Sequence, residues 1–303
     1  MIKLGLVDYF LDEFHANEYP AWIKEASKGE VQAVYAYAKI DSPKGGLTTD
    51  EWCKRNNIQK VDTIAELVSL SDGIIVLSPD NPEQHEELCK LPLESGKRVY
   101  VDKTFAETKE IAKRIFALAD ANNTPCYSTS ALRFAAEYLD LKKEMKDKPE
   151  NITSWGPGTL ETYSIHQVEP IVALMGPDIV RVQYTGPIGA ESAGTVGAGS
   201  ADAASAVAGK WPAFICEYRD GRRASASHHG WECPFGMILD FPDGTSKKLT
   251  VESDFFNLFI ADMVDFFMTG DVKVPHEETV TVIGVLEAVM KAVKDPGSWV
   301  VIS

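Results

Sequence analysis

The sequence of 303 residues contains no apolar run long enough to cross a membrane, and it shows no signal-peptide pattern. Its five cysteines are an odd number without C-x-x-C spacing, so neither a disulfide framework nor a zinc knuckle is expected. Basic residues are few, and 30 Lys and Arg against 45 Asp and Glu give a net charge of -15, which repels nucleic acid. These absences predict a cytoplasmic protein that binds neither nucleic acid nor membranes.

The turn after the first predicted strand lacks glycine. Residues 2–7 are typical of a buried strand, and the turn that follows begins at Asp8 and reads Asp-Tyr-Phe-Leu-Asp-Glu-Phe-His. A dinucleotide fingerprint needs G-x-G-x-x-G directly after this strand, because the backbone must approach the pyrophosphate closely. The turn instead carries the acids Asp8, Asp12 and Glu13, which argues against ordinary dinucleotide binding.

Short β-rich runs alternate with helical patterns over the first third of the chain. Strands are predicted at residues 2–7, 31–40, 73–77 and 99–101, and the intervening segments have apolar residues at helical spacing. This alternation predicts an α/β domain, residues 1–125, with a doubly wound, Rossmann-like parallel sheet. Such sheets bind ligands at the carboxyl ends of their strands.

The pattern changes in residues 126–303, where we expect a second, α+β domain for substrate binding and oligomerisation. Asp220-Gly221 and Pro242-Asp243-Gly244-Thr245 are turn sequences between alternating runs, so they predict hairpins of an open, mostly antiparallel sheet. Helices are predicted at 131–145, after His166, at 254–268 and at 277–293. The segment 186–209, rich in Gly, Ala and Ser, is typical of a flexible loop or lid.

Three places at predicted strand ends could carry chemistry. Asp41 could hold a ribose, although a solvated Asp in a turn is the commoner role. The Ser78-Pro79 bend lies over the sheet, and the residues after it could equally serve only to cap a helix. Lys103 could point into the cleft with a pKa lowered by desolvation, although most lysines are exposed.

Several of these segments together resemble the Gfo/Idh/MocA family of oxidoreductases. The resemblance rests on Ser78-Pro79 with His85, on Gly96-Lys97-x-Val99-x-x-Asp102-Lys103-x-x-Ala106-x-Thr108, on Arg133-Phe134, and on Pro275-His276-Glu277-Glu278 before the last helix. The departures are Asp102-Lys103-Thr104 for the family's Glu-Lys-Pro, the missing glycine loop, and Thr162 where the family's second domain has aspartate before the histidine matched by His166.

The resemblance implies hydride transfer between NAD or NADP and a sugar, polyol or related carbinol. It implies that Lys103 and His166 flank the reacting carbon, where one group accepts a proton and a cation stabilises the alkoxide. It further implies Arg133, Glu161 and Tyr163 as substrate-binding residues. The cofactor would contact Asp8, Phe10, Asp41, Ser78, Pro79, Asn81, His85 and Asp102. A homodimer or homotetramer through the C-terminal sheet is expected by the same analogy.

Two alternatives stay open. A lyase, hydrolase or isomerase on a keto-sugar needs a base but no hydride acceptor, and it could use a divalent metal held by Glu161, His166 and His228. A catalytically silent binding protein could also keep this fold. Binding of a nicotinamide dinucleotide, or turnover without one, would distinguish the three hypotheses.

Overall fold

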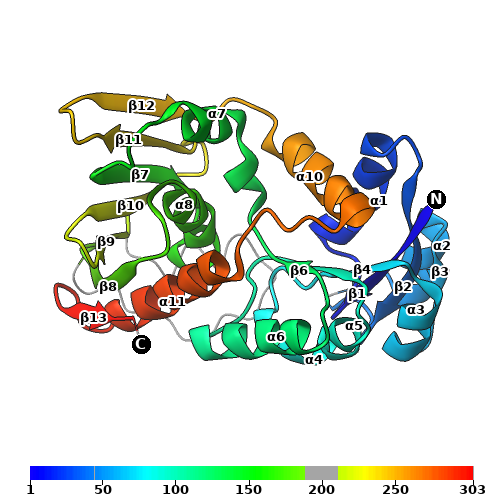
Figure 1. Ribbon diagram of the computed structural model, residues 1–303. Coiled ribbons are helices and arrows are strands. Elements are labelled where there is room, and N and C mark those ends of the chain that lie inside the picture. The colour runs from blue at the N-terminus through cyan, green and yellow to red at the C-terminus, as the bar shows by residue number, and fades with distance from the viewer. Residues whose placement is uncertain (44, 188–210, 303) are drawn as a thin grey trace. The chain divides into compact units, whose positions relative to one another are not determined.

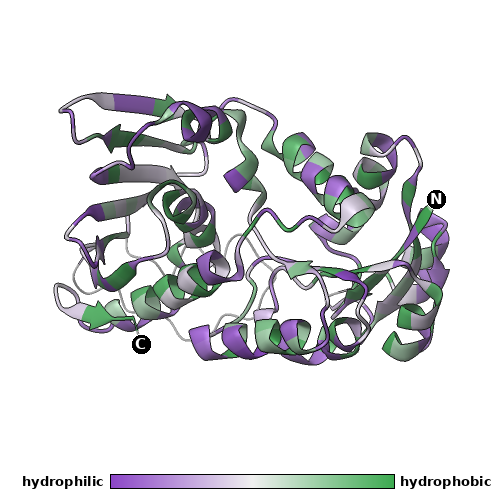
Figure 2. Cartoon of the chain, viewed as in Figure 1, coloured by the Kyte–Doolittle hydropathy of each residue, from purple (hydrophilic) through white to green (hydrophobic). Residues whose placement is uncertain are grey.

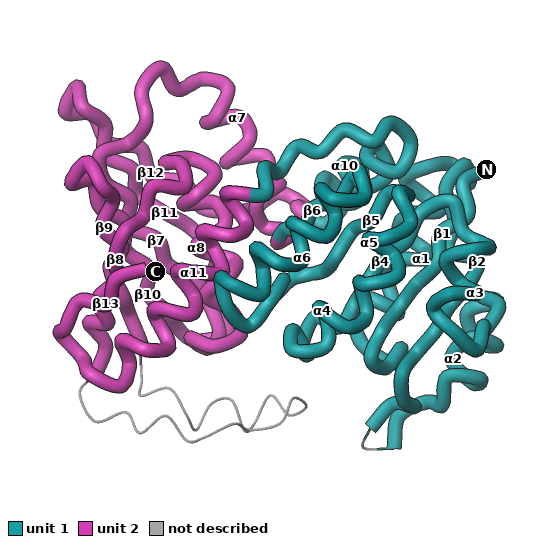
Figure 3. Tube along the Cα trace, turned by 60° about the horizontal axis from the view of Figure 1, so that its bottom comes forward, with its two compact units in different colours: residues 1–129, 256–276 teal, residues 130–255, 277–303 magenta. Residues whose placement is uncertain are grey.

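The computed structural model describes residues 1–43, 45–187 and 211–302, and the expected loop at 186–209 lies almost entirely outside them (Figure 1). The chain divides into two compact units (Figure 3). Unit 1 comprises residues 1–129 and 256–276, and unit 2 comprises residues 130–255 and 277–303. The sequence had placed a single boundary at residue 125.

Unit 1 contains one parallel sheet with strand order β3-β2-β1-β4-β5-β6, as expected for a doubly wound fold. Its strands are β1 (Ile2–Asp8), β2 (Val31–Ala38), β3 (Gln59–Lys60), β4 (Gly73–Val76), β5 (Arg98–Val101) and β6 (Cys126–Tyr127). Its helices are α1 (Phe14–Ala26), α2 (Thr49–Asn56), α3 (Ile64–Leu70), η1 (Pro82–Gln84), α4 (His85–Leu88), α5 (Lys90–Glu94), α6 (Lys109–Ala121) and α10 (Phe255–Thr269), whose first residue falls in unit 2.

Helix α10 follows most of unit 2 in the sequence but packs on the sheet of unit 1. Its Phe259 and Phe266 are buried, and their rings lie 5.6 Å from the ring of Tyr100 and 4.8 Å from the ring of Tyr127. Apolar residues recur along the helix (Figure 2). A helix pattern in the sequence shows which face is apolar but not which sheet it covers, which is why the sequence assigned this helix to the second domain.

Unit 2 contains a seven-stranded sheet with strand order β12-β11-β7-β10-β9-β8-β13, antiparallel except for the parallel pair β7 and β10. Its strands are β7 (Asn151–Pro157), β8 (Ile179–Tyr184), β9 (Ala213–Tyr218), β10 (Arg223–His229), β11 (Gly236–Asp240), β12 (Ser246–Thr250) and β13 (Trp299–Val301). Its helices are η2 (Ala131–Phe134), α7 (Ala136–Glu144), α8 (Leu160–Met175) and α11 (His276–Ala292), whose first residue falls in unit 1. Together with the sheet these helices form its core.

Buried and less buried residues alternate along the strands of this sheet, so one of its faces is covered. In β9 and β10 every second residue is buried, and the two predicted hairpins, β9–β10 and β11–β12, are confirmed. The edge strand β12 carries Lys247 and Lys248, the hydrophilic stretch visible in Figure 2, and charge on an edge strand opposes uncontrolled strand pairing. In the described part of the chain no helix is long and apolar enough to span a bilayer.

Candidate functional site

The strand order of unit 1 reverses between β1 and β4, which is where doubly wound sheets bind their ligands. Three polar residues stand at the carboxyl ends of adjacent strands here. Asp8 ends β1, Ser78 lies two residues beyond β4, and Asp102 directly follows β5. All three are almost completely buried.

The first loop carries Asp8, Phe10 and Glu13 at the spacing of the three glycines in G-x-G-x-x-G. Glu13 is the N-cap of α1, and its carboxylate accepts hydrogen bonds from the backbone N–H groups of His15, at 2.7 Å, and of Ala16. A helix N-terminus is an anion site because its first N–H groups have no partner within the helix. In this chain the side chain of its own Glu13 occupies that place.

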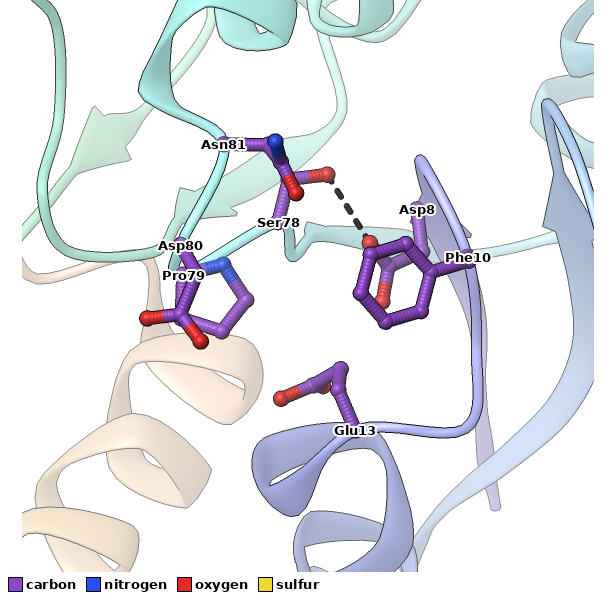
Figure 4. Close-up of a pocket in the computed structure, with 7 residues that line it drawn as sticks. All are labelled: Asp8, Phe10, Glu13, Ser78, Pro79, Asp80 and Asn81. Carbon is purple, nitrogen blue, oxygen red and sulfur yellow. Dashed lines mark hydrogen bonds between the residues drawn. The ribbon is translucent and has the colours of Figure 1, made fainter. Parts of the chain in front are cut away.

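A small hollow of about 160 Å³ lies at this strand edge (Figure 4). We call it the β1–β4 hollow, and its lining is Asp8, Phe10, Glu13, Ser78, Pro79, Asp80 and Asn81. Asp8 Oδ1 accepts from Ser78 Oγ at 2.8 Å and from the Tyr9 N–H at 2.6 Å, whereas Asp8 Oδ2 is buried without a hydrogen-bond partner in the described structure. Burial raises the pKa of Asp8 to about 8 and raises that of Glu13 well above its ordinary value.

Asp102 is held by three donors. One oxygen pairs with His15 Nδ1, and the other accepts from the Tyr100 hydroxyl at 3.1 Å and from the Lys103 N–H at 2.8 Å. Burial acts to raise the pKa of Asp102, but the charge and hydrogen bond of His15, helped by Lys103, lower it overall. The His15 ring stacks on Tyr19, with 4.7 Å between ring centroids. A carboxylate on Nδ1 fixes the tautomer of a histidine and leaves its Nε2 for proton exchange.

Lys103 lies close to this group. Its side chain is only 15% exposed, and its Nζ lies 3.9 Å from an Asp80 carboxylate oxygen. The position after β5 therefore brings a cation to the same strand edge as the Asp102–His15 pair.

Three of the other expected cofactor residues are engaged within the fold. Asp41 accepts from the Thr49 N–H at 2.8 Å and from its hydroxyl at 3.0 Å, as a cap of helix α2. His85 is fully buried between the carbonyls of Leu77 and Phe105, and burial lowers its pKa although the two carbonyls act to raise it. The Asn81 amide bonds the Glu83 carboxylate at 2.9 Å in the loop before η1.

Within unit 2, His166 is half-buried on α8, and its Nδ1 lies 2.7 Å from Ser130 Oγ. The Tyr163 ring meets the His166 ring edge-on at 5.2 Å, and Trp231 meets Tyr163 at 4.9 Å. Glu161 is exposed at the start of the same helix. The structure therefore places the expected Tyr163 beside His166, in an aromatic setting.

Arg133 has a different environment from the one its expected role suggests. It is 6% exposed, and its guanidinium pairs with Glu169 on α8, at 3.4 Å, and with Glu278 on α11. These ion pairs link three elements of unit 2. The two ion pairs are enough to explain why this arginine is buried, and its role in substrate binding stays a prediction.

The metal alternative is not supported. His228 is buried on β10, and its Nε2 lies 3.0 Å from Ser164 Oγ. No set of three His, Cys, Asp or Glu side chains in the described residues is placed to hold a metal ion, so Glu161, His166 and His228 do not form one. The sequence spacing could not show this, because β10 turns His228 toward the inside of unit 2.

Sequence reasoning missed the roles of Glu13 and His15. The sequence suggested Glu13 and His15, with Asp8 and Asp12, only as parts of a remodelled cleft in a non-redox enzyme, and it assigned neither of them a partner. The spacing of Glu13 before the first helical residues is a capping pattern, and that signal was available. The pairing of His15 with Asp102, 87 residues away, was not.

Comparison with known proteins agrees with the fold. Residues 11–129 match the model of the oxidoreductase family with an NAD-binding Rossmann fold, Gfo/Idh/MocA. The matched residues lie within unit 1. The resemblance seen in the sequence is thus confirmed. No curated protein matches the chain.

Solved structures of similar fold extend over both units. They include a probable dehydrogenase from Thermotoga maritima, with 12% identity, TM-score 0.76 and 99% of both chains covered. Myo-inositol 2-dehydrogenase from Lactobacillus plantarum has 13% identity and TM-score 0.75, covering 100% of this chain and 99% of that one. Myo-inositol dehydrogenase from Lactobacillus casei, solved with NAD(H) and myo-inositol, has the same identity and TM-score, with 100% and 97% covered. At such identities the likeness concerns the fold.

The family model is that of an NAD-binding Rossmann fold, so we compare the residues of the first loop with what a dinucleotide pyrophosphate requires. The α1 N–H groups that would meet the pyrophosphate already bond Glu13, and Asp8 and Phe10 replace the glycines that let the backbone approach. The hollow at this place carries three carboxyl groups, and no Lys, Arg or His lines it. The first loop therefore does not fit a pyrophosphate.

Proposed function

We propose that this chain is an enzyme that moves protons on a sugar- or polyol-like substrate, using the scaffold of the Gfo/Idh/MocA oxidoreductases without a dinucleotide in the first loop. The observation that carries the proposal is the Glu13 carboxylate at the N-terminus of α1, next to an Asp102–His15 pair. The substrate class is suggested by the inositol dehydrogenases of similar fold.

The groups at the strand edge suit enolisation of a keto-sugar. His15 Nε2 takes the proton from the carbon next to the carbonyl, and Asp102 stabilises the imidazolium that forms. The carbonyl oxygen becomes an enol hydroxyl when a neutral carboxylic acid donates its proton, and burial keeps Asp8 protonated near neutral pH. In an isomerisation the His15 imidazolium returns its proton to the former carbonyl carbon, and the second enediol hydroxyl gives its proton to the Asp8 carboxylate as the new carbonyl forms. In an elimination the hydroxyl on the next carbon leaves as water with the proton of the His15 imidazolium, and the enol hydroxyl returns its proton to Asp8.

A second candidate is the hydride transfer that the family resemblance implies, between NAD or NADP and a carbinol. The family match and a neighbour solved with NAD(H) support it. Lys103 and His166 are its expected polar pair, with Arg133, Glu161 and Tyr163 as substrate ligands. It requires a dinucleotide held by contacts other than those of the family's glycine loop.

Two measurements distinguish these candidates. Calorimetric titration with NAD(H) and NADP(H) measures dinucleotide binding, and NMR in D₂O measures deuterium uptake by keto-inositols and keto-sugars without nicotinamide. We expect no dinucleotide binding up to millimolar concentration, and deuterium exchange that falls about 10²–10⁴-fold in His15→Gln. The exposed His229→Gln serves as the control and should exchange at the wild-type rate.

The other outcomes are equally definite. Micromolar dinucleotide binding with turnover only in its presence establishes the redox candidate and refutes the first. If no compound of the substrate panel shows deuterium exchange or nicotinamide-dependent turnover, both candidates fail and the binding-protein alternative remains.

The expected assembly and location are also proposals. The open face of the unit 2 sheet carries Trp155 and Trp299, with Arg181 over the Trp299 ring at 4.4 Å. A second copy on this face would give the expected homodimer, and light scattering of a Trp299→Glu variant tests it. The expected cytoplasmic location agrees with five free thiols.

A further inference from the structure

We propose that the β1–β4 hollow binds a neutral hydroxyl-bearing group of the ligand, with Asp8 Oδ2 as its hydrogen-bond partner, and that it rejects phosphate. This inference rests on the proposed function, because it assigns part of the substrate to a place that the family gives to a pyrophosphate. It is carried by the unpartnered oxygen of Asp8 and by the lining of the hollow.

The first step is the state of Asp8. The residue is 1% exposed and lines the hollow, and its Oδ2 has no partner among the described residues although Oδ1 has two. Figure 4 shows the bonded oxygen turned toward Ser78 and the other on the side where Glu13 lies. Buried carboxyl oxygens almost always have a partner, so a ligand that supplies one is stabilised here.

The second step is charge. Asp8, Glu13 and Asp80 all line the hollow, and Asp102 lies close enough to Asp8 and Glu13 to raise the pKa of both. The cation at this edge, Lys103, approaches Asp80. A phosphate would be repelled by Asp80 and would meet no positive charge from Asp8 or Glu13, and the helix N–H groups that attract anions are already bonded.

The third step is size. The figure of about 160 Å³ includes space that is open to solvent, and the enclosed part of the hollow has room for about one water molecule. The hollow therefore suits a single hydroxyl group of a polyol, and Phe10 supplies an apolar wall beside it.

The test uses glycerol as a polyol fragment and inorganic pyrophosphate as the anion. Both are titrated into the full-length protein, and ¹H–¹⁵N NMR follows the amides of Tyr9 and Asn81. The Tyr9 N–H bonds both Asp8 and Ser78, so it reports directly on the hollow. We expect saturable shifts with glycerol and none with pyrophosphate.

Variants show whether Asp8 is responsible. Asp8→Ala removes the Oδ2 atom and should weaken glycerol binding about tenfold, the effect of losing one good hydrogen bond. Phe10→Trp puts a larger ring into the lining of the hollow and should abolish the shifts, which keeps the test decisive if Asp8→Ala is poorly folded. Asp50→Asn removes an exposed carboxylate that pairs with Lys60 and should bind glycerol as the wild type does.

Three results would overturn the inference: no glycerol shifts in the wild type, undiminished shifts in both variants, or shifts of the same amides by pyrophosphate at equal concentration. The proposed function fails separately. If glycerol binds through Asp8 but turnover depends on NAD, the function falls and the inference stands. If keto-sugars exchange deuterium while the hollow is silent, the inference falls and the function stands.

Discussion

Burial shifts the pKa of one ionisable side chain in each unit, and the two shifts have opposite directions. In unit 1 burial raises the pKa of Asp8 to about 8, and in unit 2 burial lowers the pKa of His228 to about 4. Both side chains are therefore neutral between those values. Asp8 lines a hollow, however, whereas His228 is enclosed next to Ser164. The difference teaches that a displaced pKa alone does not mark a site, and that an opening beside the group is needed as well.

The largest effect is expected where unit 2 pairs its buried charges. Arg133→Ala leaves the buried Glu169 without its guanidinium, and breaking a buried ion pair from one side costs about 3–5 kcal/mol. We expect the thermal midpoint to fall by about 10 °C or more. Calorimetry checks this, with Arg181→Ala as a control that should change the midpoint less, because the Arg181 side chain is 39% exposed. An equal loss in both variants would show that burial does not matter here.

Asp8→Asn should remove a loss of stability that unit 1 shows as the pH rises. Because the folded-state pKa of Asp8 is raised from its ordinary value near 3.8 to about 8, the folded state holds more protons in that window. Wild-type stability is therefore lost as pH rises from about 4 to 8, and the variant lacks this loss. Urea midpoints at pH 5 and pH 8.5 should show the variant gaining on the wild type at the higher pH. A constant difference between the two proteins would contradict the raised pKa.

His228→Gln should act in the opposite direction. The lowered pKa means that the unfolded state takes up the proton first, so wild-type stability is lost as pH falls from about 6.5 to 4. The variant should lose less over that interval, whatever its stability at pH 7. Midpoints at pH 7 and pH 4.5 measure the two slopes, and parallel slopes would refute the account.

The smallest effect concerns the two long helices that start from the sheet of unit 1. Thr108 caps α6 with a hydroxyl, as Glu13 caps α1 with a carboxylate. Thr108→Ala should cost about 1 kcal/mol, as loss of a neutral cap usually does. Thermal melts at pH 7 test it, and because this cap carries no charge, the loss should be the same at pH 5. A loss that varied with pH would mean that Thr108 does more than cap.

Much of the fold followed from the sequence, because it depends on local patterns. The continuous apolar run of β4, the alternation in β9 and β10, and the Asp220-Gly221 turn each determine a structure within a few residues. The family segment around Lys103 was also recognisable. The candidate site was less accessible to prediction, because it depends on distant partners.

Asp102 illustrates the limit. Its place after β5 was predicted, but its bond to His15 requires the register of two strands and the start of α1, which no local pattern contains. Arg133 was likewise expected beside a substrate, and its pairing with Glu278 spans 145 residues. Acidic residues in a loop suggest solvent exposure, so the burial of Asp8 could be learned only from the packed structure.

The late position of α10 in the chain has a consequence for how this protein is made. Unit 1 needs residues 256–276 to cover Tyr100 and Tyr127, yet a ribosome completes residues 130–255 before it reaches them. The aromatic face of the parallel sheet therefore stays uncovered while residues 130–255 are synthesised. A fragment ending at residue 129 would remain in that state permanently, and a faithful dissection of the protein must join residues 1–129 to 256–276 through a linker.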